Sequence, residues 1–211
     1  MATLTIITDR TLCARPLRRT VREAIAGGAD VVQLREKDLS DRELLALARS
    51  LKEALSGTNA KLVINHAIDV AVAADADGVH LGWRSLGPEE ARRALGPGKL
   101  IGVSVHSVEE MQNAEFGGAD YVHYGPIFET PSKKGRLAPV GCEGLRELKQ
   151  KASIPVIAVG GISEERAADV IAAGADGIAV ISAVMASPNP QVAVKRLKRE
   201  MEFGRMKAGR P

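Results

Sequence analysis

Short apolar runs alternate along the chain with longer segments in which apolar positions recur at helical spacing. Four of the runs share a turn of small residues, then an aspartate and a hydrophobic stretch. They are residues 27–34 (GGADVVQL), 74–81 (ADADGVHL), 117–124 (GGADYVHY) and 173–180 (AGADGIAV). Each interval between them is long enough for two strand and helix pairs, so the repeat predicts eight strands.

The remaining four strands are expected at Leu4–Thr8, Lys61–Asn65, Leu100–Val105 and Pro155–Val159. Capping residues predict helices that begin near Ser40, Ser107 and Ser163. Strands that alternate with helices are typical of a parallel sheet with crossover helices. We therefore expect the α/β class and a (β/α)8 TIM barrel, with an open doubly wound sheet as the alternative. In such a barrel, functional residues lie at the carboxyl ends of the strands.

Length and composition narrow the class of protein. The 211 residues lie near the lower end of the range for one barrel, roughly 200–400 residues, so we expect a single domain over 1–211 with a C-terminal helix and basic tail over 189–211. Cys13 and Cys142 lack metal-ligand spacing, and no apolar stretch approaches the roughly 18 residues of a membrane span. A cytoplasmic protein without a membrane partner is expected.

The formal net charge is +3, and basic residues concentrate in the last helix and tail. That segment offers only Phe203 for base stacking, so nucleic acid is not an expected partner. We expect a phosphorylated small molecule instead, and the sequence allows a homo-oligomer.

Three clusters at expected strand ends are candidates for a binding site. In the first, Gln33, Arg35 and Lys37 share one side of an extended segment because strand side chains alternate. A strand covered on both faces carries three such polar residues only when they face a polar site. Surface salt bridges are the alternative interpretation.

The second cluster combines Gly160 and Gly161, after the seventh strand, with Ile181 and Ser182, after the eighth. Glycines let backbone amides approach an anion closely, and the first residues of a short helix present further free amides. This pattern predicts a phosphate site. A plain tight turn is the alternative.

The third cluster is the segment 125–141, which is rich in Gly, Pro and Lys and is expected to form a flap after the sixth strand. Thr130, Ser132 and Lys133 are placed to fold over an anionic substrate and to exclude water, as active-site lids do.

These clusters together make the chain resemble the thiamine phosphate synthase and thiazole tautomerase superfamily. The resemblance rests on VQLREKD, GVHLG, GVSVHS, ADYVHYGPIFET, the T-P-S-K run, IPVIAVGGIS and ADGIAVISAV, in that order along the chain. It implies that Gln33, Arg35, Lys37 and Asn65 bind the pyrimidine or its pyrophosphate. It also implies that the flap residues and the two glycine-rich turns bind the phosphate of hydroxyethylthiazole.

The two branches of the superfamily differ in their metal ligands. The resemblance implies that the synthases bind Mg²⁺ through an aspartate directly after the Asn65 position and another after the GVHLG motif. This chain has His66 and Ser85 at those positions. The tautomerase branch similarly lacks both aspartates and shares the sequence motif SVHSxEE with this chain.

We therefore expect an isomerase, a thiazole tautomerase that aromatises a carboxylated thiazole phosphate by proton transfer without metal or cofactor. Thiamine phosphate synthase is the alternative, with Mg²⁺ required in that case only. A non-catalytic barrel that binds thiazole or thiamine phosphate is a further alternative.

Histidine suits a proton transfer near neutral pH. The tautomerase branch carries a histidine where this chain has Pro126, so another histidine is needed. His123 and His106 are the candidate acid/base residues because strand alternation turns both toward the barrel interior. Ser104 is in phase with His106 and is expected to contact substrate.

Overall fold

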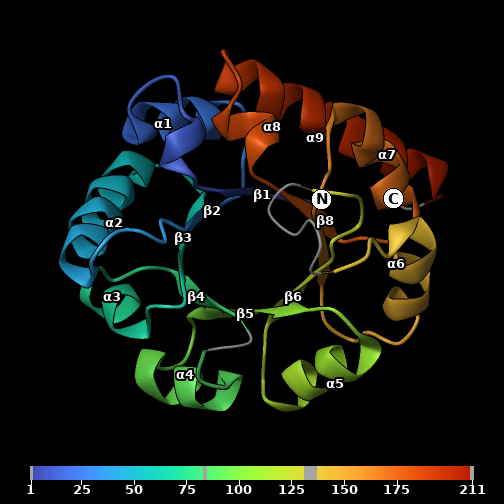
Figure 1. The fold of residues 1–211 in the computed structure, drawn as a ribbon, viewed down its shortest axis with the longest axis horizontal. Helices are drawn as coiled ribbons and strands as arrows, with labels where there is room; N and C mark the ends of the chain where they lie inside the picture. The colour runs from blue at the N-terminus through green and yellow to red at the C-terminus, as the bar shows by residue number, and fades with distance from the viewer. Residues whose placement is uncertain (1, 83–84, 131–136, 210–211) are drawn as a thin grey trace.

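The computed structural model describes residues 2–82, 85–130 and 137–209. Eight parallel strands pair in chain order, and β1 also pairs with β8, so the sheet closes into a barrel (Figure 1). The strands are β1 (Thr3–Ile7), β2 (Val31–Leu34), β3 (Lys61–Asn65), β4 (Gly78–Leu81), β5 (Leu100–Val105), β6 (Tyr121–Tyr124), β7 (Val156–Val159) and β8 (Gly177–Val180). The predicted (β/α)8 barrel is confirmed, and closure excludes the open sheet.

The helices form a ring around the barrel (Figure 1). They are η1 (Arg10–Leu12), α1 (Leu17–Ala26), α2 (Asp41–Leu55), α3 (Ile68–Ala73), α4 (Pro88–Leu95), α5 (Val108–Phe116), α6 (Gly141–Lys149), α7 (Glu164–Ala172), α8 (Ser182–Met185) and α9 (Pro190–Lys207). Ser40 caps α2 with a capping box, and Ser107 caps α5, as predicted. None of the described helices is long and apolar enough to cross a membrane.

The apolar core lies mainly between the barrel and this ring of helices. Alternate strand residues such as Ile6, Val32 and Ile64 are fully buried there. The opposite alternation points into the barrel, where Ile7, Ile157 and Ala179 form a separate small cluster. Across β2 to β6 several inward-facing side chains are polar, among them Gln33, His80 and His123.

The repeated aspartates explain why the small-residue pattern recurs four times. Asp30 precedes β2, and its carboxylate accepts the Leu4 amide of β1 at 2.7 Å while its own amide donates to the Leu4 carbonyl at 2.9 Å. The same pair of hydrogen bonds recurs for Asp77 with Leu62, Asp120 with Ile101 and Asp176 with Val156. Each carboxylate also pairs with a cation, in turn Lys198, Lys52, Arg92 and Lys149. The sequence shows that these aspartates recur but gives no sign of the bonds that they make.

Replacing one of these aspartates should destabilise the barrel. Asp176→Ala removes the acceptor of the Val156 amide, and we expect the free energy of unfolding to fall by about 1.5–3 kcal/mol, the range for hydrogen bonds to charged groups. Urea unfolding measures the loss. Asp169→Ala is the matched control because the side chain of Asp169 forms an exposed ion pair with Lys207, and its removal should cost less than about 1 kcal/mol. Equal losses in the two variants would contradict the assigned role.

Candidate functional site

The carboxyl ends of β2 and β3 bring two predicted binding residues together. Gln33 Nε2 donates to Asn65 Oδ1 at 2.9 Å. Gln33 is buried, and its Oε1 atom has no hydrogen-bond partner among the described residues. A buried amide oxygen without a partner is costly, so it is suited to accept a hydrogen bond from a ligand.

Arg35 and Lys37 follow Gln33 on the same side of the chain. The Arg35 amide donates to Thr8 Oγ1 at 2.9 Å, which anchors the segment to the end of β1. Burial lowers the pKa of Arg35, and across the described ranges its guanidinium forms no hydrogen bond or ion pair. The pKa of His66 is lowered by burial and then by the charges of Arg35 and Lys37, so both cations face the end of β3.

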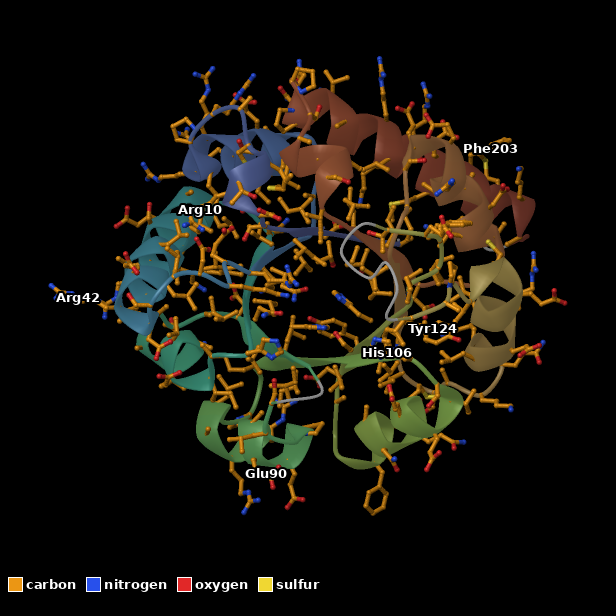
Figure 2. The ribbon with its side chains drawn as sticks, in the orientation of Figure 1. Arg10, Arg42, Glu90, His106, Tyr124 and Phe203 are labelled. Carbon is orange, nitrogen blue, oxygen red and sulfur yellow. The ribbon has the colours of Figure 1, made fainter. Side chains whose placement is uncertain are left out.

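The acidic residues interleaved with these cations point elsewhere. Arg10 binds Glu36 at 3.1 Å and Asp38 at 2.6 Å. Figure 2 shows Arg10 beside α2, at the edge of the barrel mouth. The salt bridges of this segment are therefore formed by Glu36 and Asp38 with Arg10. Arg35 remains available to bind an anion at the mouth of the barrel, by which we mean the carboxyl ends of the strands.

A group of polar side chains lines the barrel interior below the mouth. His80 contacts Ser104 Oγ through Nε2 at 2.9 Å and the Tyr121 hydroxyl through Nδ1 at 3.3 Å. The His123 ring lies 4.0 Å from the His80 ring, and His123 Nε2 is buried without a partner. Gly102 leaves the space for this cluster, because a β-carbon there would collide with His80 and Tyr121.

Both interior histidines are neutral near pH 7. Burial lowers the pKa of His123 to about 3, and burial together with the neighbouring His123 lowers the pKa of His80 well below its usual value. A general acid/base works best with a pKa near the working pH, which His123 lacks.

His106 lies higher, beyond the end of β5. Its amide and its Nδ1 atom contact Glu110 Oε2 at 2.7 and 3.3 Å. Figure 2 shows His106 at the barrel rim, away from Arg10. The structure thus places Ser104 in the interior cluster and ties His106 to the first turn of α5.

The predicted phosphate site lies at the ends of β7 and β8, and β1 separates β8 from β2 in the closed sheet. Gly160 and Gly161 have φ values of +100° and +63°, which favour glycine. Ser182 begins α8 and is exposed. No acceptor within the described part of the chain takes a hydrogen bond from the amides of Gly160, Gly161, Ile181 or Ser182. The four predicted residues are therefore free to donate to an anion.

The segment after β6 also requires these glycines. Ile127 and Phe128 donate to the carbonyls of Val159 and Gly160 at 2.9 and 3.0 Å, and a β-carbon on Gly161 would collide with Phe128. This contact directs the chain toward Thr130, the last described residue before a gap. Ser132 and Lys133 lie outside the described residues, so their assignment stays a prediction.

His66 and Ser85 are brought together by the ends of β3 and β4. His66 Nδ1 lies 2.5 Å from Ser85 Oγ, and the Gly82 amide donates to the same hydroxyl at 3.0 Å. Sequence reasoning identified both positions from the resemblance but gave no sign that the two side chains bind each other.

The buried His123 should make stability depend on pH. An unfolded histidine has a pKa of roughly 6.5, whereas folded His123 titrates at about 3. Only the unfolded chain therefore gains this proton as the pH falls below 6.5, and stability decreases. Urea unfolding at pH 7 and pH 5 should show that His123→Leu loses about 2 kcal/mol less than the unmodified chain over this interval. Between pH 7 and pH 8 the two proteins should change equally, and identical losses down to pH 5 would contradict the assignment.

Known proteins resemble this chain over nearly its whole length. The family model described as thiamine monophosphate synthase matches residues 4–184. The thiamine-phosphate synthase of Moorella thermoacetica is 44% identical over 193 residues, covering 92% of each chain. That of Clostridium novyi is 46% identical over 195 residues, covering 92% of this chain and 96% of its own. The structure of thiamine phosphate pyrophosphorylase from Pyrococcus furiosus superposes with a TM-score of 0.87 at 39% identity, covering 96% of both chains.

These comparisons correct our expectation of an isomerase. Relatives at 44–46% identity carry the name of the synthase, a transferase, so the thiazole tautomerase assignment was wrong. The substitution of two metal-binding aspartates is weaker evidence for the branch of the family than similarity along the whole chain, because single positions change more readily than a whole sequence. The acid/base roles of His123 and His106 belonged to that reaction and are not carried over. By its full-length similarity, this chain belongs to the thiamine monophosphate synthase family.

Proposed function

We propose that this chain is a thiamine phosphate synthase, a transferase that joins hydroxymethylpyrimidine pyrophosphate to hydroxyethylthiazole phosphate. The observation that carries the proposal is the presence of two separate anion sites at the strand ends, Arg35 and Lys37 after β2 and the free amides after β7 and β8. Two phosphorylated substrates require two such sites. The names of the relatives at 44–46% identity support the same reaction.

In this reaction the thiazole nitrogen forms a bond to the methylene carbon of the pyrimidine while the bond from that carbon to pyrophosphate breaks. Gln33 Oε1 accepts a hydrogen bond from the pyrimidine, and Asn65 holds the Gln33 amide in place. Arg35 and Lys37 stabilise the negative charge that grows on the departing pyrophosphate. The amides at Gly160, Gly161 and Ser182 hold the thiazole phosphate and thereby orient its ring nitrogen.

Mg²⁺ is the metal expected for this family, but the residues at its expected positions do not fit it. Mg²⁺ prefers oxygen ligands, above all carboxylates and phosphates. Here Nδ1 of His66 is bonded to Ser85, and the charges of Arg35 and Lys37 lower the pKa of His66. Such a field repels a dication, so we assign none of the steps above to a metal held by these side chains.

The direct test combines both substrates with the purified chain and follows thiamine phosphate and released pyrophosphate by chromatography. We expect both products in equal amounts, and neither when one substrate is omitted. Binding of thiazole phosphate without product would favour a non-catalytic binding protein and would contradict the proposal.

Arg35→Gln should lower kcat/KM for the pyrimidine pyrophosphate by roughly ten- to hundredfold, the loss expected when a hydrogen bond to a charged group is removed. Arg42→Gln on α2 is the matched control, because Figure 2 shows Arg42 pointing outward, away from the mouth. Steady-state rates against each substrate measure the change. Equal effects of the two substitutions would contradict the assigned role of Arg35.

Ser182→Asp should raise KM for the thiazole phosphate by about tenfold or more, because a carboxylate would then lie beside the amides that hold a dianion. Ala186→Asp places the same charge at the other end of α8, where it is exposed. KM for the pyrimidine pyrophosphate should change little in both variants. A selective increase for that substrate instead would exchange the two assigned subsites.

A further inference from the structure

The His66 and Ser85 side chains form an ordered unit at the mouth. The His66 amide donates to the His80 carbonyl at 3.0 Å, which fixes the end of β3 against the end of β4. His66 adopts φ +65°, a conformation that residues other than glycine adopt rarely and that turns its side chain back over Gly82. The imidazole therefore has a definite position although it is exposed.

A hydrogen-bond chain joins Gly82, Ser85 and His66. The Gly82 amide donates to Ser85 Oγ at 3.0 Å, which leaves the hydroxyl hydrogen available for Nδ1 of His66, 2.5 Å away. A neutral imidazole that accepts this hydrogen at Nδ1 carries its own hydrogen on Nε2. His66 Nε2 makes no hydrogen bond to any residue in the described ranges. In this tautomer Nε2 is a donor with no acceptor among those residues.

The surrounding charges favour an anion at this donor. Arg35 and Lys37 both act on His66 electrostatically. The nearby carboxylates of Glu36 and Asp38 are bound by Arg10, and that of Asp9, whose charge acts on Arg35, accepts hydrogen bonds from Thr11. Within the ranges 2–82, 85–130 and 137–209, no three His, Cys, Asp or Glu side chains are grouped to hold a metal ion. The strand ends therefore present donors and positive charge rather than ligands for a dication.

We infer that this site binds the pyrophosphate group directly, with His66 Nε2 donating beside Arg35 and Lys37, and without a divalent cation held by the protein. Ser85 acts as a positioning residue, since it orients the imidazole and sets its tautomer. The inference rests on the proposed function for the identity of the substrate, and it replaces a metal bridge by direct hydrogen bonds to the phosphate oxygens. Charge-assisted hydrogen bonds of this kind are among the stronger ones in proteins.

Binding can be measured without turnover. Calorimetric titration of the full chain with inorganic pyrophosphate in EDTA should show binding, and electron paramagnetic resonance should show no Mn²⁺ bound to the chain in the absence of pyrophosphate. The double variant His66→Asp, Ser85→Asp restores two carboxylates at the strand ends. It should bind Mn²⁺, and its pyrophosphate affinity in EDTA should fall by about tenfold or more because like charges now face the ligand.

The matched control adds the same two charges at the opposite end of the barrel. Ser56→Asp with Asn59→Asp changes two exposed residues of the loop between α2 and β3. This control should bind pyrophosphate like the unmodified chain and should bind no Mn²⁺. Ser85→Ala isolates the positioning role: it should weaken pyrophosphate binding in EDTA by several-fold, and His66→Ala should add little further loss once Ser85 is gone.

The outcomes separate this inference from the proposed function. Pyrophosphate binding by the unmodified chain that disappears in EDTA and returns with Mg²⁺ would overturn the inference, even if thiamine phosphate is formed. Binding that persists in EDTA supports the inference, and a failure to form thiamine phosphate would then count against the proposed reaction alone.

Discussion

Four aspartates, each joined to the preceding strand by two hydrogen bonds, hold the amino ends of the barrel strands in register. Each carboxylate accepts one strand amide, and the amide of the same aspartate donates to the carbonyl of that residue, as in Asp30 with Leu4. In a parallel barrel the register at one end sets which side chains face inward at the other. The relative positions of Gln33, Asn65 and His80 at the mouth therefore depend on bonds made at the far end of the strands.

The two halves of the barrel interior differ in polarity. Ile7, Ile157 and Ala179 form an apolar cluster across β7, β8 and β1, and the free amides lie at the ends of β7 and β8. Across β2 to β6 several inward-facing side chains are polar, and the cationic residues lie above them. In the reaction that we propose, phosphate recognition by backbone amides would not depend on side-chain charge, whereas binding of the pyrophosphate would rely on it. This asymmetry suits a reaction in which one charged group leaves and the other stays.

The interior histidines are neutral and therefore add no charge to the barrel interior. His80 joins Ser104 and Tyr121, and His123 stacks on it with one unpartnered nitrogen. A protonated imidazole there would add positive charge beneath the mouth, and the buried carboxylate of Glu36 is already paired with Arg10. Burial keeps both imidazoles neutral, and the free energy of unfolding therefore decreases in acid. His66 faces the mouth instead, where Ser85 is hydrogen-bonded to its Nδ1 atom.

Much of this protein followed from the sequence because it depends on local pattern. Strand and helix alternation predicted the barrel, period-two alternation placed Gln33, Arg35 and Lys37 on one side, and the glycine turns predicted the free amides at Gly160 and Gly161. The identity of the reaction did not follow from two substituted positions, since similarity along the whole chain contradicted it. Only the tertiary structure decided that Ser85 binds His66 across 19 positions of sequence, and that Asp176 bonds Val156. Pairing between separate strands sets these contacts, as burial sets the low pKa of His123, and neither leaves a periodic signal in a single chain.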